Sequence, residues 1–234
     1  MRNVLLVLVY IFLLTLGVPI LLVCVLFGLR DSFIAYGRWM MRVGRFILGI
    51  DVEAAGLDRL DRGTPYVFMS NHLSFLDGPL LMTVLDRPAR VIVKRFVFRV
   101  PVLGLGMRFS GYVPLDREGA GAGKVSIARA ARLIREKRYS FLIYPEGTRS
   151  WEGNLLPFRR GGFFLALACG APIVPVTVQG TYELMPRGKR FVRKGRVKIT
   201  FHEPVHVTGC TPDAIPELIE RVRGAVSSVL PATS

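Results

Sequence analysis

The 234-residue chain is short of cysteine, and several catalytic signatures are missing from it. Its three cysteines, Cys24, Cys169 and Cys210, lie far apart, are odd in number and match no metal-binding spacing. They form no disulfide framework, so we expect a reducing compartment. The sequence also contains no Gly-x-Ser-x-Gly elbow, which argues against an α/β-hydrolase serine enzyme.

Acidic residues are also scarce. The chain has 17 Asp and Glu against 32 Lys and Arg, which gives a formal net charge of +15. Apolar residues nevertheless make up 51% of the chain, and its mean hydropathy is +0.40. A chain that is both apolar and basic points to a membrane surface with anionic lipid, or to nucleic acid.

The stretch from Asn3 to Leu29 contains no charged residue. It is longer than the roughly 20 residues that span a bilayer. Gly17-Val18-Pro19 interrupts it, which leaves two interpretations: one kinked span, or a helical hairpin that enters a single leaflet. Four arginines follow, and by the positive-inside rule they place the body of the protein on the cytoplasmic side. These are Arg30, Arg38, Arg42 and Arg45.

Residues 32–50 carry aromatic and aliphatic side chains at near-helical spacing, with arginines between them. This pattern predicts an amphipathic helix, which lies either along the membrane interface or against the protein core. We therefore expect residues 1–49 to be a membrane anchor with an interfacial helix, and residues 50–234 to form one domain.

Within that domain, strand and helix patterns alternate. Such alternation predicts an α/β fold with a mostly parallel central sheet and helices on both faces. The expected strands are 66–70, 90–93, 112–115, 139–144, 173–178 and 197–202, after a strand and turn within 51–60. The expected helices are 78–85, 122–137, 163–169 and 213–229.

His72 and Asp77 lie on the predicted turn between the strand 66–70 and the helix 78–85. A carboxylate can there hold one imidazole nitrogen while the other faces a ligand, which suits a general base. The alternative is a purely structural turn, in which Asp77 caps the helix. Taken alone, this motif favours the structural interpretation.

Two further strand ends carry groups suited to an anion. Lys94 ends the second core strand, where α/β sheets place ligand-binding groups. Tyr144-Pro145-Glu146-Gly147-Thr148-Arg149 follows the strand 139–144. Gly147 permits close backbone approach, and Arg149 offers a planar fork for a phosphate. Glu146 has two possible roles: pairing with Arg149, or accepting a hydrogen bond from a substrate hydroxyl.

We expect no metal site. His202-Glu203-Pro204-Val205-His206 has the letters of a zinc-protease motif. That motif requires a helix, which Pro204 forbids.

Four blocks in order along the chain resemble the glycerolipid acyltransferases, most closely the 1-acyl-sn-glycerol-3-phosphate (lysophosphatidate) acyltransferases. Tyr144 stands where that family more often has Phe. The resemblance covers roughly residues 50–205. The four blocks are Asn71-His72-Leu73-Ser74-Phe75-Leu76-Asp77, the segment from Lys94 to Arg117, Tyr144-Pro145-Glu146-Gly147-Thr148-Arg149-Ser150, and Ala171-Pro172-Ile173-Val174-Pro175-Val176.

The resemblance implies that residues 50–234 are a catalytic domain, which moves an acyl group from acyl-CoA or acyl carrier protein to the sn-2 hydroxyl of lysophosphatidate. It implies His72 as the base, oriented by Asp77. Lys94, Arg149 and Arg117 would bind the acceptor phosphate, and Glu146, Gly147 and Thr148 would shape that site. No cofactor beyond the acyl donor is expected. The setting would be the cytoplasmic face of the inner membrane.

Two alternatives stay open at this point. The acceptor can be another lyso-lipid, such as lyso-ornithine lipid, or glycerol 3-phosphate itself, because such enzymes share these motifs. The chain can also be a non-enzymatic basic module that binds anionic membranes or nucleic acid. Such a module explains the charge, but it explains neither Pro145-Glu146-Gly147-Thr148-Arg149 nor the His72 motif. We expect no nucleic-acid partner.

Overall fold

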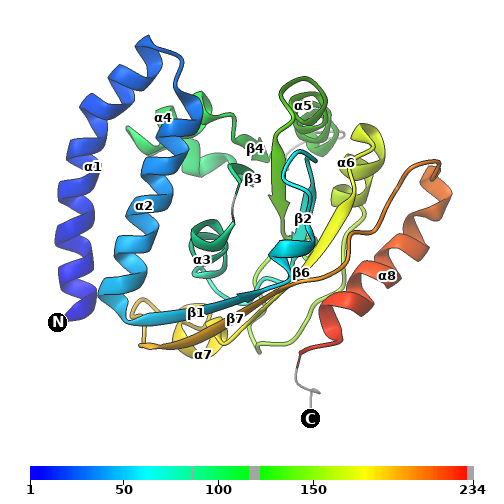
Figure 1. The fold of residues 1–234 in the computed structure, drawn as a ribbon. Coiled ribbons are helices and arrows are strands. Elements are labelled where there is room, and N and C mark those ends of the chain that lie inside the picture. The colour runs from blue at the N-terminus through cyan, green and yellow to red at the C-terminus, as the bar shows by residue number, and fades with distance from the viewer. Residues whose placement is uncertain (86, 116–121, 231–234) are drawn as a thin grey trace.

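The computed structural model describes residues 1–85, 87–115 and 122–230, and a seven-stranded sheet runs through them (Figure 1). Its strand order is β1-β7-β6-β2-β5-β3-β4. β7 runs antiparallel to β6, and the other neighbouring pairs are parallel. The predicted mostly parallel α/β sheet is thus confirmed. The strands are β1 (Ile50–Ala55), β2 (Val67–Ser70), β3 (Ala89–Lys94), β4 (Val113–Leu115), β5 (Ser140–Ile143), β6 (Ile173–Gln179) and β7 (Gly195–Phe201).

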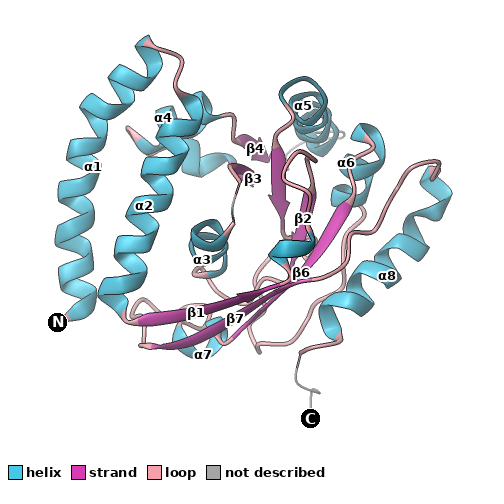
Figure 2. Cartoon of the chain, in the orientation of Figure 1, coloured by secondary structure: helices cyan, strands magenta, loops and turns pink. Residues whose placement is uncertain are grey.

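Helices cover both faces of the sheet, as Figure 2 shows. Successive strand residues point to opposite faces, so Phe68 of β2 enters one core and its neighbours Val67 and Met69 enter the other. The first core is closed by α2 (Arg30–Leu48) and α3 (Asp77–Val84), and the second by α5 (Ala122–Lys137), α6 (Gly161–Cys169) and α8 (Ile215–Ser227). The remaining helical elements are α1 (Arg2–Leu26), α4 (Leu103–Ser110), α7 (Thr181–Leu184) and three short 3₁₀ turns, η1 (Leu57–Arg59), η2 (Arg95–Arg99) and η3 (Pro212–Ala214).

α1 and α2 form an antiparallel helical hairpin (Figure 1). α1 continues through Gly17-Val18-Pro19, and the chain instead reverses between the two helices, at residues 27–29. Two glycines let the helices approach closely: Tyr36 packs over Gly17, and Tyr10 packs over Gly44. The Tyr36 hydroxyl also donates to the carbonyl of Leu13, at 2.6 Å. The uncharged stretch thus forms one helix, the first arm of this hairpin, and not a hairpin of its own; α2 is the second arm.

The start of the hairpin is attached to the domain that carries the sheet. Asn3 and the backbone of Val192 exchange two hydrogen bonds, of 2.9 and 3.2 Å. Among the described residues, α1 is the one helix that is long and apolar enough to cross a membrane. Most of its large apolar side chains are exposed, including Phe12, Leu22 and Leu26. The outer side of the hairpin is therefore an apolar surface with no protein against it among the described residues.

α2 is packed against the protein on the side that faces α3. Arg38 donates to the carbonyls of Met82 and Leu85, and Arg42 donates to that of Thr83. These arginines satisfy the last carbonyls of α3, which have no partner inside that helix. Of the two interpretations of residues 32–50, packing against the core describes this side of the helix. Elsewhere on α2, the side chains of Trp39 and Phe46 remain exposed.

Candidate active site at the carboxyl ends of β2, β5 and β3

The sheet order places three functional segments side by side. β5 lies between β2 and β3, and Leu142 of β5 pairs with Phe68 on one side and with Val91 on the other. Asn71 and Lys94 therefore lie at the same level along their strands. In parallel strands these carboxyl ends open on one edge of the sheet, where α/β proteins bind ligands.

His72 and Asp77 meet at this edge. His72 Nδ1 lies 2.8 Å from Asp77 Oδ2. Asp77 is buried, whereas 21% of the His72 side chain is exposed. His72 Nε2 has no hydrogen-bond partner among the described residues. A carboxylate at Nδ1 and an open Nε2 are the arrangement that a general base needs.

The same carboxylate also builds the turn. Asp77 Oδ2 accepts the backbone N–H groups of Leu73 and Ser74, both at 2.8 Å, and Oδ1 accepts the hydroxyl of Thr181 at 2.6 Å. The structural and the catalytic interpretations of Asp77 therefore do not compete. One carboxylate holds the turn and the imidazole together.

The segment after β5 holds the backbone of His72. Its N–H donates to Glu146 Oε1 at 2.6 Å, and its carbonyl accepts the N–H of Ser150 at 3.0 Å. On the other side, the buried Asn71 side chain makes two 2.8 Å hydrogen bonds with the backbone of Val178 on β6. His72 is thus fixed between the two strands that flank β2.

Glu146 is buried and bonds backbone groups. Its Oε2 accepts the N–H of Leu156 at 3.0 Å, so both oxygens are occupied by main-chain donors, not by Arg149. Burial raises the pKa of Glu146 to about 7, and the hydrogen bonds from His72 and Leu156 act in the opposite direction. This geometry makes Glu146 a support for the His72 backbone.

Arg149 and Thr148 line a pocket of about 410 Å³ beside the His72 turn. Gly147, with φ at +72°, turns the chain into it, and the Arg149 guanidinium lies 5.9 Å from the ring of Phe75. Arg187 completes the rim, because its Nη1 donates to the Arg149 carbonyl and to Thr148 Oγ1. The other lining residues are Ser150, Trp151, Glu152, Asn154 and Leu156.

Of the other two expected phosphate-binding residues, the structure describes one. Lys94 is exposed at the end of β3, on the edge that carries His72. Arg117 lies outside the described residues. Among those that the structure describes, no group of three or more His, Cys, Asp or Glu side chains could hold a metal ion.

Two residues with clear contacts to the site were missed in the sequence. Thr181 bonds Asp77, and Arg187 bonds the turn at Thr148 and Arg149. Both lie in the segment after β6, where no recognised motif occurs. Gly180, with φ at +88°, directly precedes Thr181 and marks the turn that brings this segment back to the site.

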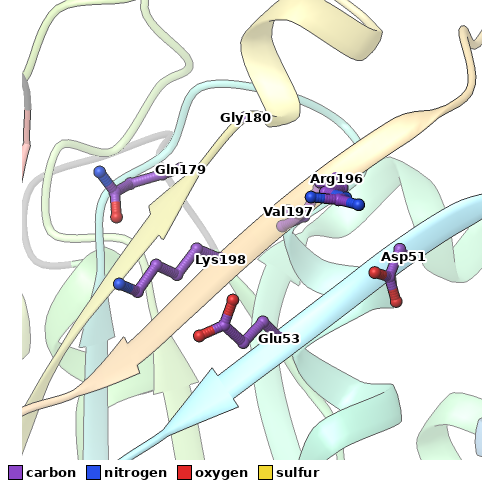
Figure 3. A pocket seen from close by; sticks show the side chains of 7 residues that line it. All are labelled: Asp51, Glu53, Gln179, Gly180, Arg196, Val197 and Lys198. Atoms are coloured by element: carbon purple, nitrogen blue, oxygen red, sulfur yellow. The ribbon is translucent and has the colours of Figure 1, made fainter.

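A second pocket, of about 210 Å³, lies on the open face of β1 and β7 (Figure 3). Asp51 pairs in register with Arg196, and Glu53 pairs with Lys198. Opposite charges side by side stabilise neighbouring strands by roughly 0.2–1 kcal/mol per pair. These charges have a structural explanation, and the pocket contains none of the predicted site residues.

Several known proteins of one enzyme family are similar to this chain. A family model described as Acyltransferase matches residues 51–179. Human 1-acyl-sn-glycerol-3-phosphate acyltransferase alpha is 31% identical over 218 residues, which cover 93% of this chain and 76% of the human protein. The chloroplastic 1-acyl-sn-glycerol-3-phosphate acyltransferase BAT2 of Brassica napus is 37% identical over 156 residues, covering 66% of this chain and 45% of that protein.

The fold is also that of a solved structure. The crystal structure of the 1-acyl-sn-glycerophosphate (LPA) acyltransferase PlsC from Thermotoga maritima superposes with a TM-score of 0.75, over 97% of each chain, at 23% identity. The match to the family model and the human relative show that this chain belongs to the 1-acyl-sn-glycerol-3-phosphate acyltransferase family.

Proposed function

We propose that this protein transfers an acyl group from a thioester donor to the sn-2 hydroxyl of lysophosphatidate, which gives phosphatidate. The observation that carries the proposal is the His72–Asp77 pair at 2.8 Å, with Nε2 open at the ligand edge of the sheet. The human and Brassica napus relatives, both named 1-acyl-sn-glycerol-3-phosphate acyltransferases, support the choice of acceptor.

The reaction needs one base and no covalent enzyme intermediate, because a thioester is already activated. His72 Nε2 takes the proton of the acceptor hydroxyl as its oxygen attacks the thioester carbonyl. The tetrahedral intermediate then expels the thiolate, which takes that proton from the imidazolium. Asp77 keeps the proton on Nδ1 and stabilises the imidazolium, and such a base contributes about 10²- to 10⁴-fold.

The acceptor phosphate binds beside the base. Arg149 presents a planar fork on the rim of the pocket, and Lys94 presents a charge from the end of β3. Arg117 adds a third cation, while Gly147 and Thr148 shape the turn. Holding the phosphate here brings the glycerol hydroxyl to Nε2, which is catalysis by positioning.

The acceptor reaches the site from the membrane. Residues 1–49 act as the anchor and residues 50–234 as the catalytic domain, on the cytoplasmic face of the inner membrane. The exposed apolar residues of α1 support this arrangement. Phe96 and Leu105 add to it, since they are 62% and 66% exposed in a basic segment that packs on α2 through Gly106 and Phe33.

The decisive assay uses the purified full chain with each acceptor and each donor in turn. Lysophosphatidate, lyso-ornithine lipid and glycerol 3-phosphate are offered with acyl-CoA or acyl carrier protein, and products are identified by mass spectrometry. Phospholipase A2 then releases the new chain if it was added at sn-2. We expect phosphatidate as the main product. Faster acylation of lyso-ornithine lipid would move the acceptor assignment to that lipid.

Membrane attachment has its own test. Flotation with vesicles containing anionic phosphatidylglycerol should carry the protein, and binding to zwitterionic vesicles should be weaker. Equal binding to both kinds of vesicle would show that anionic lipid is not needed and that the apolar hairpin is sufficient for attachment.

A further inference from the structure

The ring of Tyr144 lies parallel to the imidazole of His72. The two ring centroids are 3.9 Å apart, and the planes differ by 18°. Tyr144 directly follows β5, so it comes from the neighbouring strand and not from the turn that carries His72. This contact was not anticipated from the sequence, where Tyr144 stood out only because the family more often has Phe at this position.

We infer that Tyr144 is a positioning residue for His72 and that its aromatic face, not its hydroxyl, serves this role. The inference rests on the proposed function of His72 as the base. Asp77 holds the imidazole by one edge, through a single hydrogen bond to Nδ1. Such a bond leaves the ring able to tilt out of its plane, and an aromatic face at stacking distance opposes that tilt.

The stack also bears on the charge that develops during the reaction. When His72 takes the acceptor proton, the imidazolium lies over an electron-rich ring. A cation over an aromatic face is stabilised by about 0.5–2 kcal/mol, and the larger values apply where water is excluded. The contact is therefore stronger for the protonated base than for the neutral one, which is what a contribution to turnover requires.

The hydroxyl of Tyr144 takes no part in this contact. It is buried and has no hydrogen-bond partner among the described residues. It lies 3.4 Å from where a Cβ on Gly78 would be, at the first turn of α3. Burial, with a smaller effect from Asp77, raises the pKa of Tyr144 well above its usual value, so the phenol stays neutral. An unpaired buried hydroxyl lowers stability, so a Phe at this position should give a more stable protein. The Phe ring should stack on His72 as the Tyr ring does.

Three substitutions separate the ring from the hydroxyl. Tyr144→Phe keeps the aromatic face, while Tyr144→Leu and Tyr144→Met replace it with aliphatic volume. With lysophosphatidate and acyl-CoA, we expect Phe to retain most of the kcat and to raise Tm by a few degrees. Leu and Met should lower kcat by about 10-fold and leave both KM values within about twofold.

Histidine NMR supplies a readout that does not depend on turnover. A proton on an imidazole stacked against an aromatic ring is shifted upfield by the ring current. The His72 signal, assigned by its loss in His72→Ala, should keep this shift in Tyr144→Phe and lose it in the Leu or Met variant. The shift is measured even if the wild type proves inactive on lysophosphatidate, so the stack and the acceptor are tested separately.

Two results would overturn the inference. One is a folded Leu or Met variant whose kcat stays within about twofold of wild type. The other is a Tyr144→Phe variant that loses as much kcat as Tyr144→Leu, because the hydroxyl and not the ring would then be the part of Tyr144 that supports catalysis.

Discussion

Thr181 Oγ1 lies 2.6 Å from Asp77 Oδ1, and this hydrogen bond joins the segment after β6 to the first residue of α3. Both residues are buried. The carboxylate that orients His72 is therefore itself oriented by a residue more than 100 positions away in the sequence. The precision of the catalytic pair depends on the sheet order as well as on the local turn.

Removing this hydroxyl should weaken catalysis without affecting substrate binding. Thr181→Val keeps the shape and leaves Asp77 Oδ1 without its donor, so we expect kcat to fall by about 3- to 10-fold with little change in KM. Steady-state kinetics on the purified protein measures this. Thr181→Ser restores the hydroxyl and should recover most of the loss. Equal kcat values for Thr181→Val and Thr181→Ser would show that the hydroxyl of Thr181 does not contribute to catalysis.

Glu146 should make stability depend on pH. Its pKa is raised to about 7 in the folded protein, from an ordinary value of 4.5. The folded state thus binds more protons than the unfolded state between these values. Unfolding free energy should fall as pH rises from about 4.5 to about 7, by up to about 3 kcal/mol, and should level off above that.

Glu146→Gln isolates this contribution, because its side chain does not titrate. The Tm of the wild type minus that of Glu146→Gln, followed from pH 4.5 to 7.5 in detergent, should decrease and then become constant. Parallel curves for the two proteins over the whole range would show that Glu146 does not titrate there.

Arg149 should discriminate between acceptors. Arg149→Ala is expected to lower kcat/KM for lysophosphatidate by at least about 10-fold more than for an uncharged monoacylglycerol. Arg149→Lys keeps the charge but loses the planar fork, so it should still cost activity. Arg221→Ala, an exposed cation on α8, is the matched control. An equal fractional loss on both acceptors would make Arg149 a structural residue of the turn.

The hairpin can be tested with two glycines of the same helix. A methyl group at Gly44 would collide with Tyr10, whereas one at Gly37 has no neighbour within 4 Å. Gly44→Ala should therefore lower Tm by several degrees. Gly37→Ala should leave it unchanged or raise it slightly, because Ala favours a helix by up to about 1 kcal/mol over Gly. Similar Tm values for both variants would contradict the close packing of α1 on α2.

The site residues that could be predicted from the sequence are those that belong to short local motifs. His72 and Asp77 are five residues apart on one turn, and Lys94 and Arg149 each follow a strand of apolar residues. The rule that parallel strands end on one edge was enough to bring these segments together.

What the sequence could not reveal is set by contacts between distant segments. Thr181 and Arg187 reach the site only because β6 lies next to β2, and nothing local distinguishes them. Gly17-Val18-Pro19 was expected to break or kink the helix. The structure has one helix through these residues, with Pro19 inside it, so the single span describes them and the break does not. α4 was missed because it is short and contains two glycines, Gly104 and Gly106, which disfavour a helix.

The central claim is that His72 is the base of an acyl transfer to lysophosphatidate. The most direct test is the turnover of purified His72→Ala with lysophosphatidate and acyl-CoA, measured beside His206→Ala, which changes an exposed histidine on another segment. We expect His72→Ala to lose at least about 100-fold in kcat while it keeps its Tm and vesicle binding, and His206→Ala to remain active. A folded His72→Ala protein with near-wild-type turnover would contradict the mechanism.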